Sequence, residues 1–175
     1  MLSETVHLQL RPFSGDDLRA VIAGKSEGEA QLGLPLAEGL RDFYVSGEVS
    51  PAWMEQLRKL RTPDPWVHGF GLIDKQSSRL VGTAGFKGPP DTSGVVEIAY
   101  GIVPAHQGRG YATEAAAALV DFAFSDERVR LVRAHTLPTP NASTRVLGKC
   151  GFVHVGEVVD PDDGPVWRWE RMKDA

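Results

Sequence analysis

The chain has 175 residues, of which 42% are apolar and 24% are charged, and this length and composition fit one folded domain, residues 1–175. Its net charge of −4 and pI of about 5.7 exclude a strongly basic protein, so we expect no nucleic acid as a partner. The single cysteine, Cys150, excludes an internal disulfide and suits a reducing compartment.

The sequence carries no pattern of a membrane segment or a targeting signal. It has no run of about 18 apolar residues, and its N-terminus lacks a basic segment followed by an apolar one. We therefore expect a cytoplasmic protein that has no membrane as a partner.

The predicted elements begin with a strand at residues 6–12, where apolar and polar side chains alternate. A helix over residues 16–25 follows, with Ser14 as its cap and acidic residues in its first turn. Two helical segments are then expected over residues 36–45 and 51–60, and a serine–proline pair opens the second. The pattern around these two segments is mixed and predicts nothing further.

Strands dominate the middle of the chain. Residues 66–74 and 79–87 predict a hairpin around a polar turn, and residues 95–103 predict a strand that Pro104 ends. Four consecutive alanines then favour a helix over residues 111–125.

The last part of the chain alternates between the two kinds of element. A strand is expected at residues 131–137, a short helix at residues 141–150, and two final strands at residues 152–159 and 166–172. This order predicts a mixed α/β sheet of seven strands with helices on both faces.

The turn between the strand at residues 95–103 and the alanine-rich helix has the composition of an anion site. Gly108 and Gly110 carry no Cβ and let the backbone approach an anion closely. The first turn of the helix offers unpaired N–H groups and the positive end of its dipole. Arg109 adds a cation and Thr113 a hydroxyl. The turn predicts a phosphate site, with a ligand-free glycine connection as the alternative.

Two other phosphate-binding motifs do not fit this turn. A Walker A loop needs a lysine after its last glycine, and no lysine is present here. A dinucleotide fingerprint needs a third glycine and a doubly wound parallel sheet. A nucleotide-dependent oxidoreductase is therefore disfavoured.

The turn resembles the acetyl-CoA signature of the GNAT superfamily of N-acetyltransferases, whose three defined positions are filled here by Gln107, Gly110 and Ala112. Residues 141–152, NASTRVLGKCGF, resemble the second cofactor motif of that superfamily. Together with EIAYGI and GRGYATEA, the pattern is most similar to the branch of Rim-type ribosomal-protein N-terminal acetyltransferases. The resemblance covers the whole chain and implies a twisted, mostly antiparallel sheet.

The resemblance also implies acetyl-CoA as the acyl donor. The strands at residues 95–103 and 131–137 would splay apart around its pantetheine arm, and Gly101 would mark the bulge that opens the gap. Asn141 precedes Ser143 by two residues rather than by the three that are common in the branch, so Ser143 or Thr144 can take the hydroxyl role. The expected cofactor-binding residues are Ile102, Val103, Gln107, Gly108, Arg109, Gly110, Tyr111, Ala112, Thr113 and Asn141.

The reaction implied by the resemblance is direct attack of an amine on the thioester in a ternary complex, which needs a base and a proton donor. Glu97 is the candidate base because it lies in an otherwise apolar strand, where a carboxylate becomes a stronger base; an edge glutamate facing solvent or an arginine is the alternative. Ser143 is the first candidate proton donor and Tyr111 the second. Ser143 can equally be a helix cap, and Tyr111 can simply pack beside the cofactor.

The remaining polar and aromatic residues predict less. The five histidines have no ligand spacing, so we expect no metal, and Cys150 is expected to be buried rather than nucleophilic. The acceptor is an amine of a small molecule or a protein N-terminus, and a homodimer is compatible with this branch. A non-catalytic acyl-CoA sensor on the same fold is the alternative function. The aromatic residues that can line an acceptor wall, or pack in the core, are Trp53, Trp66, Phe43 and Tyr44.

Overall fold

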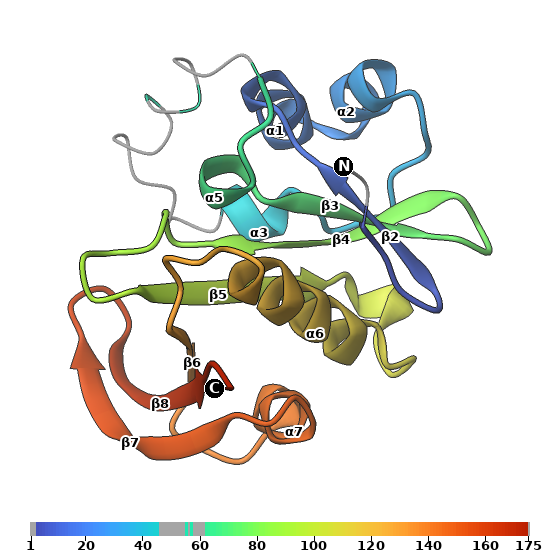
Figure 1. Cartoon of the computed structure of the whole chain (residues 1–175). Helices are drawn as coiled ribbons and strands as arrows, with labels where there is room; N and C mark the ends of the chain where they lie inside the picture. The colour runs from blue at the N-terminus through green and yellow to red at the C-terminus, as the bar shows by residue number, and fades with distance from the viewer. Residues whose placement is uncertain (1–2, 46–54, 56, 58–61, 175) are drawn as a thin grey trace.

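The computed structural model describes residues 3–45, 55, 57 and 62–174, which form one mixed sheet with helices on both faces (Figure 1). The sheet has eight strands in the order β1-β2-β3-β4-β5-β6-β8-β7. Its neighbouring strands pair antiparallel except β5 and β6, which are parallel. The predicted fold class is confirmed. The expected number of seven strands was wrong because the two-residue strand β1 pairs with β2.

The bounds of the elements follow the chain order. They are β1 (Ser3–Glu4), β2 (Leu8–Pro12), α1 (Gly15–Ala23), α2 (Lys25–Leu32), α3 (Asp42–Val45), α5 (Pro65–His68), β3 (Phe70–Asp74), β4 (Arg79–Phe86), β5 (Val95–Ile102), the 3-10 turn η1 (Pro104–His106), α6 (Tyr111–Phe124), β6 (Leu131–Thr136), α7 (Ala142–Lys149), β7 (Val153–Asp160) and β8 (Gly164–Met172).

The first half of the chain departs most from the sequence prediction. Ser14 caps α1 as expected, in a capping box with Asp17. The predicted strand at residues 66–74 begins late, because Asp64 accepts a hydrogen bond from the Trp66 N–H and starts the short helix α5. The predicted helix at residues 51–60 lies outside the described residues, apart from two positions.

The segment before α3 also differs from its predicted helix over residues 36–45. Leu36 forms a parallel bridge with Leu80, and the Ala37 N–H donates to the Leu80 carbonyl at 2.9 Å. The extended segment therefore lies beside the start of β4 and pairs with it. Only Asp42–Val45 of the predicted helix is helical. Tertiary pairing has replaced local helix propensity here.

The two strands β5 and β6 pair only where they begin. The paired residues are Val95 with Leu131, Val96 with Val132, and Glu97 with Arg133. Beyond this point β4 stays paired with β5 as far as Ile102, and β8 stays paired with β6 as far as Thr136, so the two inner edges separate. The predicted splay is confirmed, and its apex lies at Glu97.

The splay does not need a bulge at Gly101. This glycine pairs with Thr83 in an unbroken register, so the predicted bulge was wrong. A Cβ at Gly101 would instead come within 2.5 Å of the Phe43 ring, which explains why a residue without a side chain stands there.

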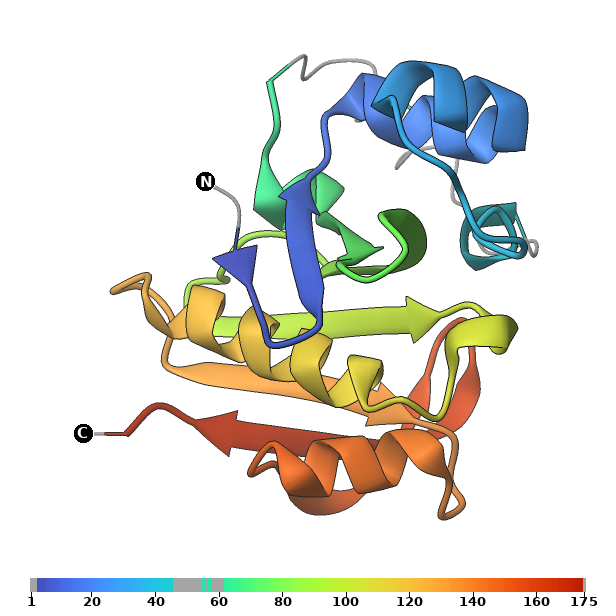
Figure 2. The ribbon, with the colours of Figure 1, turned by 90° about the vertical axis from the view of Figure 1, so that its right-hand side faces the viewer.

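Helices cover both faces of β5. The Tyr100 hydroxyl meets Ser143 of α7, while the ring of Phe43 in α3 lies over Gly101. Since neighbouring residues of a strand point to opposite faces, α7 and α3 flank opposite faces. Figure 2 shows α6 beside α7, with α1, α2 and α3 on the other side of the sheet. Among the described residues no helix has the length and apolar character to cross a bilayer.

The apolar face of α6 is the centre of the core on its side of the sheet. Leu119 is fully buried there, between Ala115 and Ala123, which are equally inaccessible. We expect Leu119→Ala to lower the free energy of unfolding by about 2–5 kcal/mol, because it leaves a cavity. The control is Leu137→Ala, since Leu137 is 66% exposed and the same truncation there should cost about 0.5 kcal/mol or less. Equal losses in urea unfolding would contradict this placement of the core.

Candidate active site

A cleft of about 420 Å³ opens between the end of β5, the start of α6 and α7. It brings most of the predicted cofactor residues together with Ser143, which is far from them in the sequence. The residues that line it are Tyr100, Gly101, Ile102, His106, Gln107, Gly108, Gly110, Tyr111, Ala112, Ala142, Ser143, Arg145, Val146 and Lys149. The predicted site residues outside this lining are Glu97, Val103, Arg109, Thr113 and Asn141.

The first turn of α6 opens toward the cleft without a side-chain cap. Gly110 is the N-cap residue, and its φ of +82° lies in the left-handed region that favours glycine. Gly108 has a similar φ of +79°. An added Cβ would meet nothing at either position, so the backbone conformation rather than crowding requires glycine. The N–H groups of the first turn are therefore available to an anion.

Gln107 supports the turn from the side of β5. Its amide Nε2 donates to the Ile102 carbonyl at 3.0 Å and so ties the turn to the end of the strand. This contact gives the glutamine of the signature a bracing role, which sequence alone did not predict.

The backbone of β5 alternates between its two neighbours. The Val103 N–H donates to the Val81 carbonyl at 2.9 Å, and the Val103 carbonyl accepts from the His106 N–H at 3.0 Å. Val103 therefore has no free backbone N–H, and its predicted pairing with a cofactor arm was wrong in this respect. The even-numbered residues Tyr100 and Ile102 direct their backbone groups into the splay instead, because bonding sides alternate along an antiparallel strand.

Ser143 lies in the first turn of α7 with a free hydroxyl. Asn141 is the N-cap: its side chain accepts from the Thr144 N–H at 2.9 Å, and Thr144 reciprocates toward the Asn141 N–H. The alternative that Ser143 caps the helix was therefore wrong. Asn141 is committed to this capping box and does not line the cleft. The Ser143 Oγ meets the Tyr100 hydroxyl at 3.1 Å, and burial raises the pKa of Tyr100.

The cations of the cleft come from α7 rather than from the glycine turn. Arg109 is exposed and outside the lining, whereas Arg145 and Lys149 line it. Their spacing of four residues places both on one face of the helix. This spacing was visible in the sequence, but which face α7 presents to the cleft depends on tertiary packing.

Two further predictions concern the back of α6. The Thr113 carbonyl accepts a weak hydrogen bond from the Cys150 Sγ at 3.6 Å, and Thr113 is not among the residues that line the cleft. Cys150 is buried as predicted, and burial raises the pKa of its thiol. A buried, protonated thiol is a poor nucleophile.

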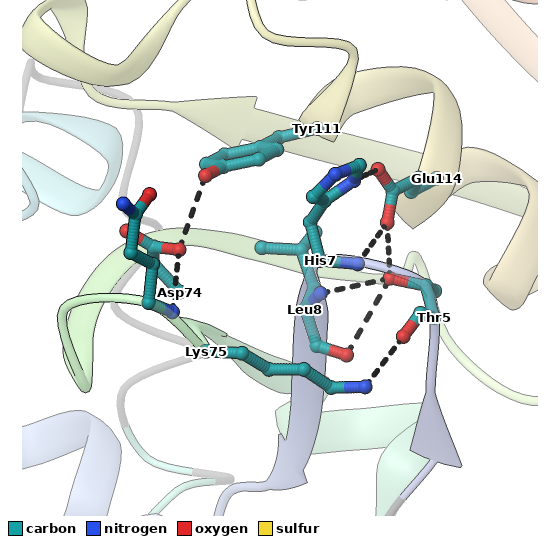
Figure 3. Close-up of polar contacts among 8 residues, drawn as sticks. Thr5, His7, Leu8, Asp74, Lys75, Tyr111 and Glu114 are labelled. Atoms are coloured by element: carbon teal, nitrogen blue, oxygen red, sulfur yellow. Dashed lines mark hydrogen bonds and ion pairs between the residues drawn. The ribbon is translucent and has the colours of Figure 1, made fainter.

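Tyr111 lines the cleft, and its hydroxyl contacts β3. It donates to Asp74 Oδ1 at 3.1 Å, at the end of β3 (Figure 3). Burial alone would raise the pKa of Asp74, but hydrogen bonds from Ser77, Gln76 and Tyr111 outweigh it and lower that pKa. The Tyr111 hydroxyl is thus committed to a buried carboxylate, and its role as a proton donor stays a prediction.

A second polar contact holds the same turn of α6 to the N-terminal hairpin. Glu114 accepts hydrogen bonds from the Thr5 hydroxyl and from the His7 backbone N–H, and it contacts His7 Nδ1 at 2.6 Å (Figure 3). The two contacts at Tyr111 and Glu114 fix the start of α6 from outside the cleft.

Glu97 lies at the apex of the splay on the face opposite α7. Its Oε2 contacts Lys87 Nζ at 2.8 Å and His135 Nδ1 at 3.1 Å. The expected apolar surroundings were wrong, because the strands on either side bring polar side chains next to it. Glu97 shares its face with Gly101, since residues two and four apart along a strand point the same way.

The aromatic candidates for an acceptor wall separate into two groups. Phe43 is 40% exposed over Gly101, on the face of Glu97. Trp66 instead packs against Phe86 and Phe122 of α6, with ring centroids 4.6 and 5.1 Å away. Trp66 is thus a packing residue of the opposite face. Tyr44 is a hydrogen-bonded neighbour of Thr83, burial raises its pKa, and Trp53 lies outside the described residues.

The sequence profile of the acetyltransferase (GNAT) domain matches residues 7–153. The chain belongs to the GNAT family of acetyltransferases. Within the part of this GNAT chain that the structure describes, no cluster of three His, Cys, Asp or Glu side chains has the arrangement of a metal site.

Individual relatives agree with the family. The uncharacterized N-acetyltransferase YjdG of Bacillus subtilis is 33% identical over 90 residues, which are 51% of this chain and 51% of YjdG. The match therefore spans about half of that relative. The uncharacterized N-acetyltransferase YoaA of Bacillus subtilis is 28% identical over 155 residues, which are 87% of this chain and 83% of YoaA.

A solved structure has the same fold over its whole length. RimL, a ribosomal L7/L12 alpha-N-protein acetyltransferase in complex with coenzyme A, superposes with a TM-score of 0.66. The superposition covers 100% of this chain and 99% of RimL. The sequence identity is 16%, so the likeness shows a shared fold.

Removal of the Tyr111 hydroxyl tests the contact with Asp74. We expect Tyr111→Phe to cost about 1.5–3 kcal/mol in urea unfolding at neutral pH, because the hydroxyl donates to a buried carboxylate. The folded pKa of Asp74 is lowered, so this stabilisation is complete above the unfolded value of about 3.9 and is lost as the pH falls through the folded value. The cost of Tyr111→Phe should shrink accordingly in acid.

The matched control removes the same atom from the other cleft tyrosine. Tyr100→Phe breaks a contact with a neutral hydroxyl, so its cost should stay constant between neutral and acidic pH. A cost of Tyr111→Phe that is equally constant would argue against the Asp74 contact.

Proposed function

We propose that this protein is an acetyl-CoA-dependent N-acetyltransferase, which transfers the acetyl group to a primary amine by direct attack in a ternary complex. The observation that carries this proposal is the uncapped first turn of α6, which opens onto a cleft beside a splayed strand pair. The first turn offers N–H donors to the pyrophosphate, and Arg145 and Lys149 offer cations to the phosphates.

The pantetheine arm would occupy the gap between β5 and β6. Its amides are extended hydrogen-bonding groups, and the backbone of Tyr100 and the N–H of Ile102 face this gap without a strand partner. The Ile102 carbonyl accepts from Gln107 instead. Along this path the thioester approaches the apex at Glu97 from the open end of the gap. The side chains of the candidate base and the candidate proton donors then lie on opposite faces of β5.

The chemistry needs one proton taken and one proton given. Glu97 accepts a proton from the acceptor amine, directly or through water, and the amine nitrogen forms a bond to the thioester carbonyl carbon. The carbon–sulfur bond then breaks, and the departing thiolate takes a proton from Ser143 or Tyr100. Tyr100 is protonated at neutral pH at the ordinary pKa of a phenol, and burial raises that pKa further. Tyr100 thereby replaces Tyr111 as the second candidate proton donor.

The acceptor remains a primary amine of a protein N-terminus or of a small molecule. RimL bears the name of an acetyltransferase for a protein α-amine, which makes peptides with free N-termini the first acceptors to screen. An α-amine has a pKa near 8, so about a tenth of it is neutral at pH 7 and needs only a weak base.

Binding of acetyl-CoA can be measured by titration calorimetry on wild type and Gly110→Glu. We expect the glutamate to weaken binding roughly 100-fold or more, because it places a negative charge at the helix N-terminus meant for the pyrophosphate. Gly110→Ala is the control: it adds only the strain of a left-handed residue, about 1 kcal/mol, and should weaken binding a few-fold. No binding to wild type would reject the donor.

Catalysis can be measured separately by release of free thiol in a screen of amines. We expect thiol release with at least one amine, and Glu97→Gln should lower kcat by about 100-fold or more while acetyl-CoA binding is retained. Binding without thiol release for any amine would favour the non-catalytic acyl-CoA sensor instead.

A further inference from the structure

The two carboxylate oxygens of Glu97 have different surroundings. Oε2 contacts both Lys87 Nζ, at 2.8 Å, and His135 Nδ1, at 3.1 Å. Oε1 has no ion-pair or hydrogen-bond partner in the part of the chain that the structure describes. The side chain is only about one-fifth exposed, so this difference sets its orientation rather than leaving it to rotate in solvent.

Arg168 decides which nitrogen of His135 carries a proton. Its Nε–H donates to His135 Nε2 at 3.1 Å, and a nitrogen that accepts a hydrogen bond cannot also carry a proton. The proton of a neutral His135 is therefore on Nδ1, the atom that faces Glu97. This Nδ1 is buried and has no aligned hydrogen bond, although it lies 3.1 Å from Oε2. A small rotation of the ring would align it.

The other charges around this cluster lie on β6, β7 and β8 and in the β4–β5 and β7–β8 connections. Lys87 follows β4 and also interacts with Asp160, the last residue of β7, and with Asp163 in the turn between β7 and β8. Burial would lower the pKa of Lys87, but the hydrogen bond to Glu97 and these acids outweigh it and raise that pKa. Lys87 therefore stays an ammonium at neutral pH.

Arg133, which pairs with Glu97 across the apex, is separately occupied. Its guanidinium forms an ion pair with Glu170 of β8 at 2.7 Å. Asp160 at the end of β7 also interacts electrostatically with His135, so both neighbours of Glu97 interact with this residue. Among the described residues, Lys87 and His135 are thus the two side chains within ion-pair distance of Glu97.

We propose that Lys87 and His135 are positioning residues for Glu97: they hold Oε2 and leave Oε1 as the atom that takes the proton from the acceptor amine. This inference rests on the proposed function. Lys87 has a second effect, because an ammonium beside a carboxylate favours its charged, proton-accepting form. His135 presents Nδ1 to the same oxygen and orients Glu97 from β6.

The first test is the pH profile of kcat/KM for thiol release, measured with wild type and Lys87→Met. Loss of the ammonium makes Glu97 easier to protonate, so we expect the acidic limb to move to higher pH by about half a unit to one unit. The shift is kept small because Lys87 is half exposed and its charge is screened.

The matched control is Lys25→Met. Lys25 forms an ion pair of the same 2.8 Å length with Glu38, at similar exposure of the lysine and away from the apex. The acidic limb of this variant should stay where it is in wild type. An equal shift in both variants would trace the effect to net charge and overturn the proposed role of Lys87.

The second test compares two substitutions of the histidine. His135→Asn keeps an N–H donor near the position of Nδ1, whereas His135→Phe removes it, and both lose the acceptor for Arg168. We expect kcat to fall about tenfold in His135→Phe and to recover most of this loss in His135→Asn, with the KM for acetyl-CoA unchanged in both. Equal kcat in the two variants would overturn the role of His135.

Failure of this inference can be told apart from failure of the proposed function. No thiol release by wild type with any amine would overturn both. If wild type releases thiol but Lys87→Met does not move the acidic limb, the inference is overturned and the acetyltransferase function is retained. The same holds if Glu97→Gln does not remove the acidic limb. Acetyl-CoA binding by each variant, measured by calorimetry, shows that the cleft remains folded.

Discussion

The separation of β5 from β6 is the constraint on which the rest of the site depends. The strands pair as far as Glu97 and Arg133 and then follow their outer neighbours, β4 and β8, in different directions. A backbone edge that loses its neighbour inside a protein needs another hydrogen-bond partner. The gap therefore suits an extended, amide-containing arm. The position of each group along the gap is set by its distance from the apex at Glu97.

The alternation of β5 divides the chemistry between two faces. The odd-numbered residues of β5 form backbone hydrogen bonds with β4. Among them, Glu97 and Gly101 lie on the face of α3. Even-numbered residues turn their backbone into the gap and carry Tyr100 toward Ser143 on the face of α7. In the proposed reaction, a proton is therefore taken on one side of the thioester and given on the other side.

Polar contacts outside the cleft keep its two helices in place. Asp74 and Glu114 hold the first turn of α6 to β3 and to the N-terminal hairpin, while the turn's own N–H groups stay free. Asn141 caps α7 and so releases Ser143 for the cleft. In both helices, contacts made outside the cleft thus leave other groups free to face it: the N–H groups of the first turn of α6 and the Ser143 hydroxyl of α7.

The sequence by itself determined the family, most elements and the glycine turn, because these depend on local patterns: strand alternation, helix propensity and the backbone freedom of Gly108 and Gly110. It also identified Glu97 and Ser143 as residues of interest. Only the tertiary structure decided what surrounds them. Lys87 and His135 reach Glu97, and Asp74 reaches Tyr111, across strands that are distant in the chain. Such contacts follow from strand order and register, and no local pattern encodes which side chains meet across a sheet.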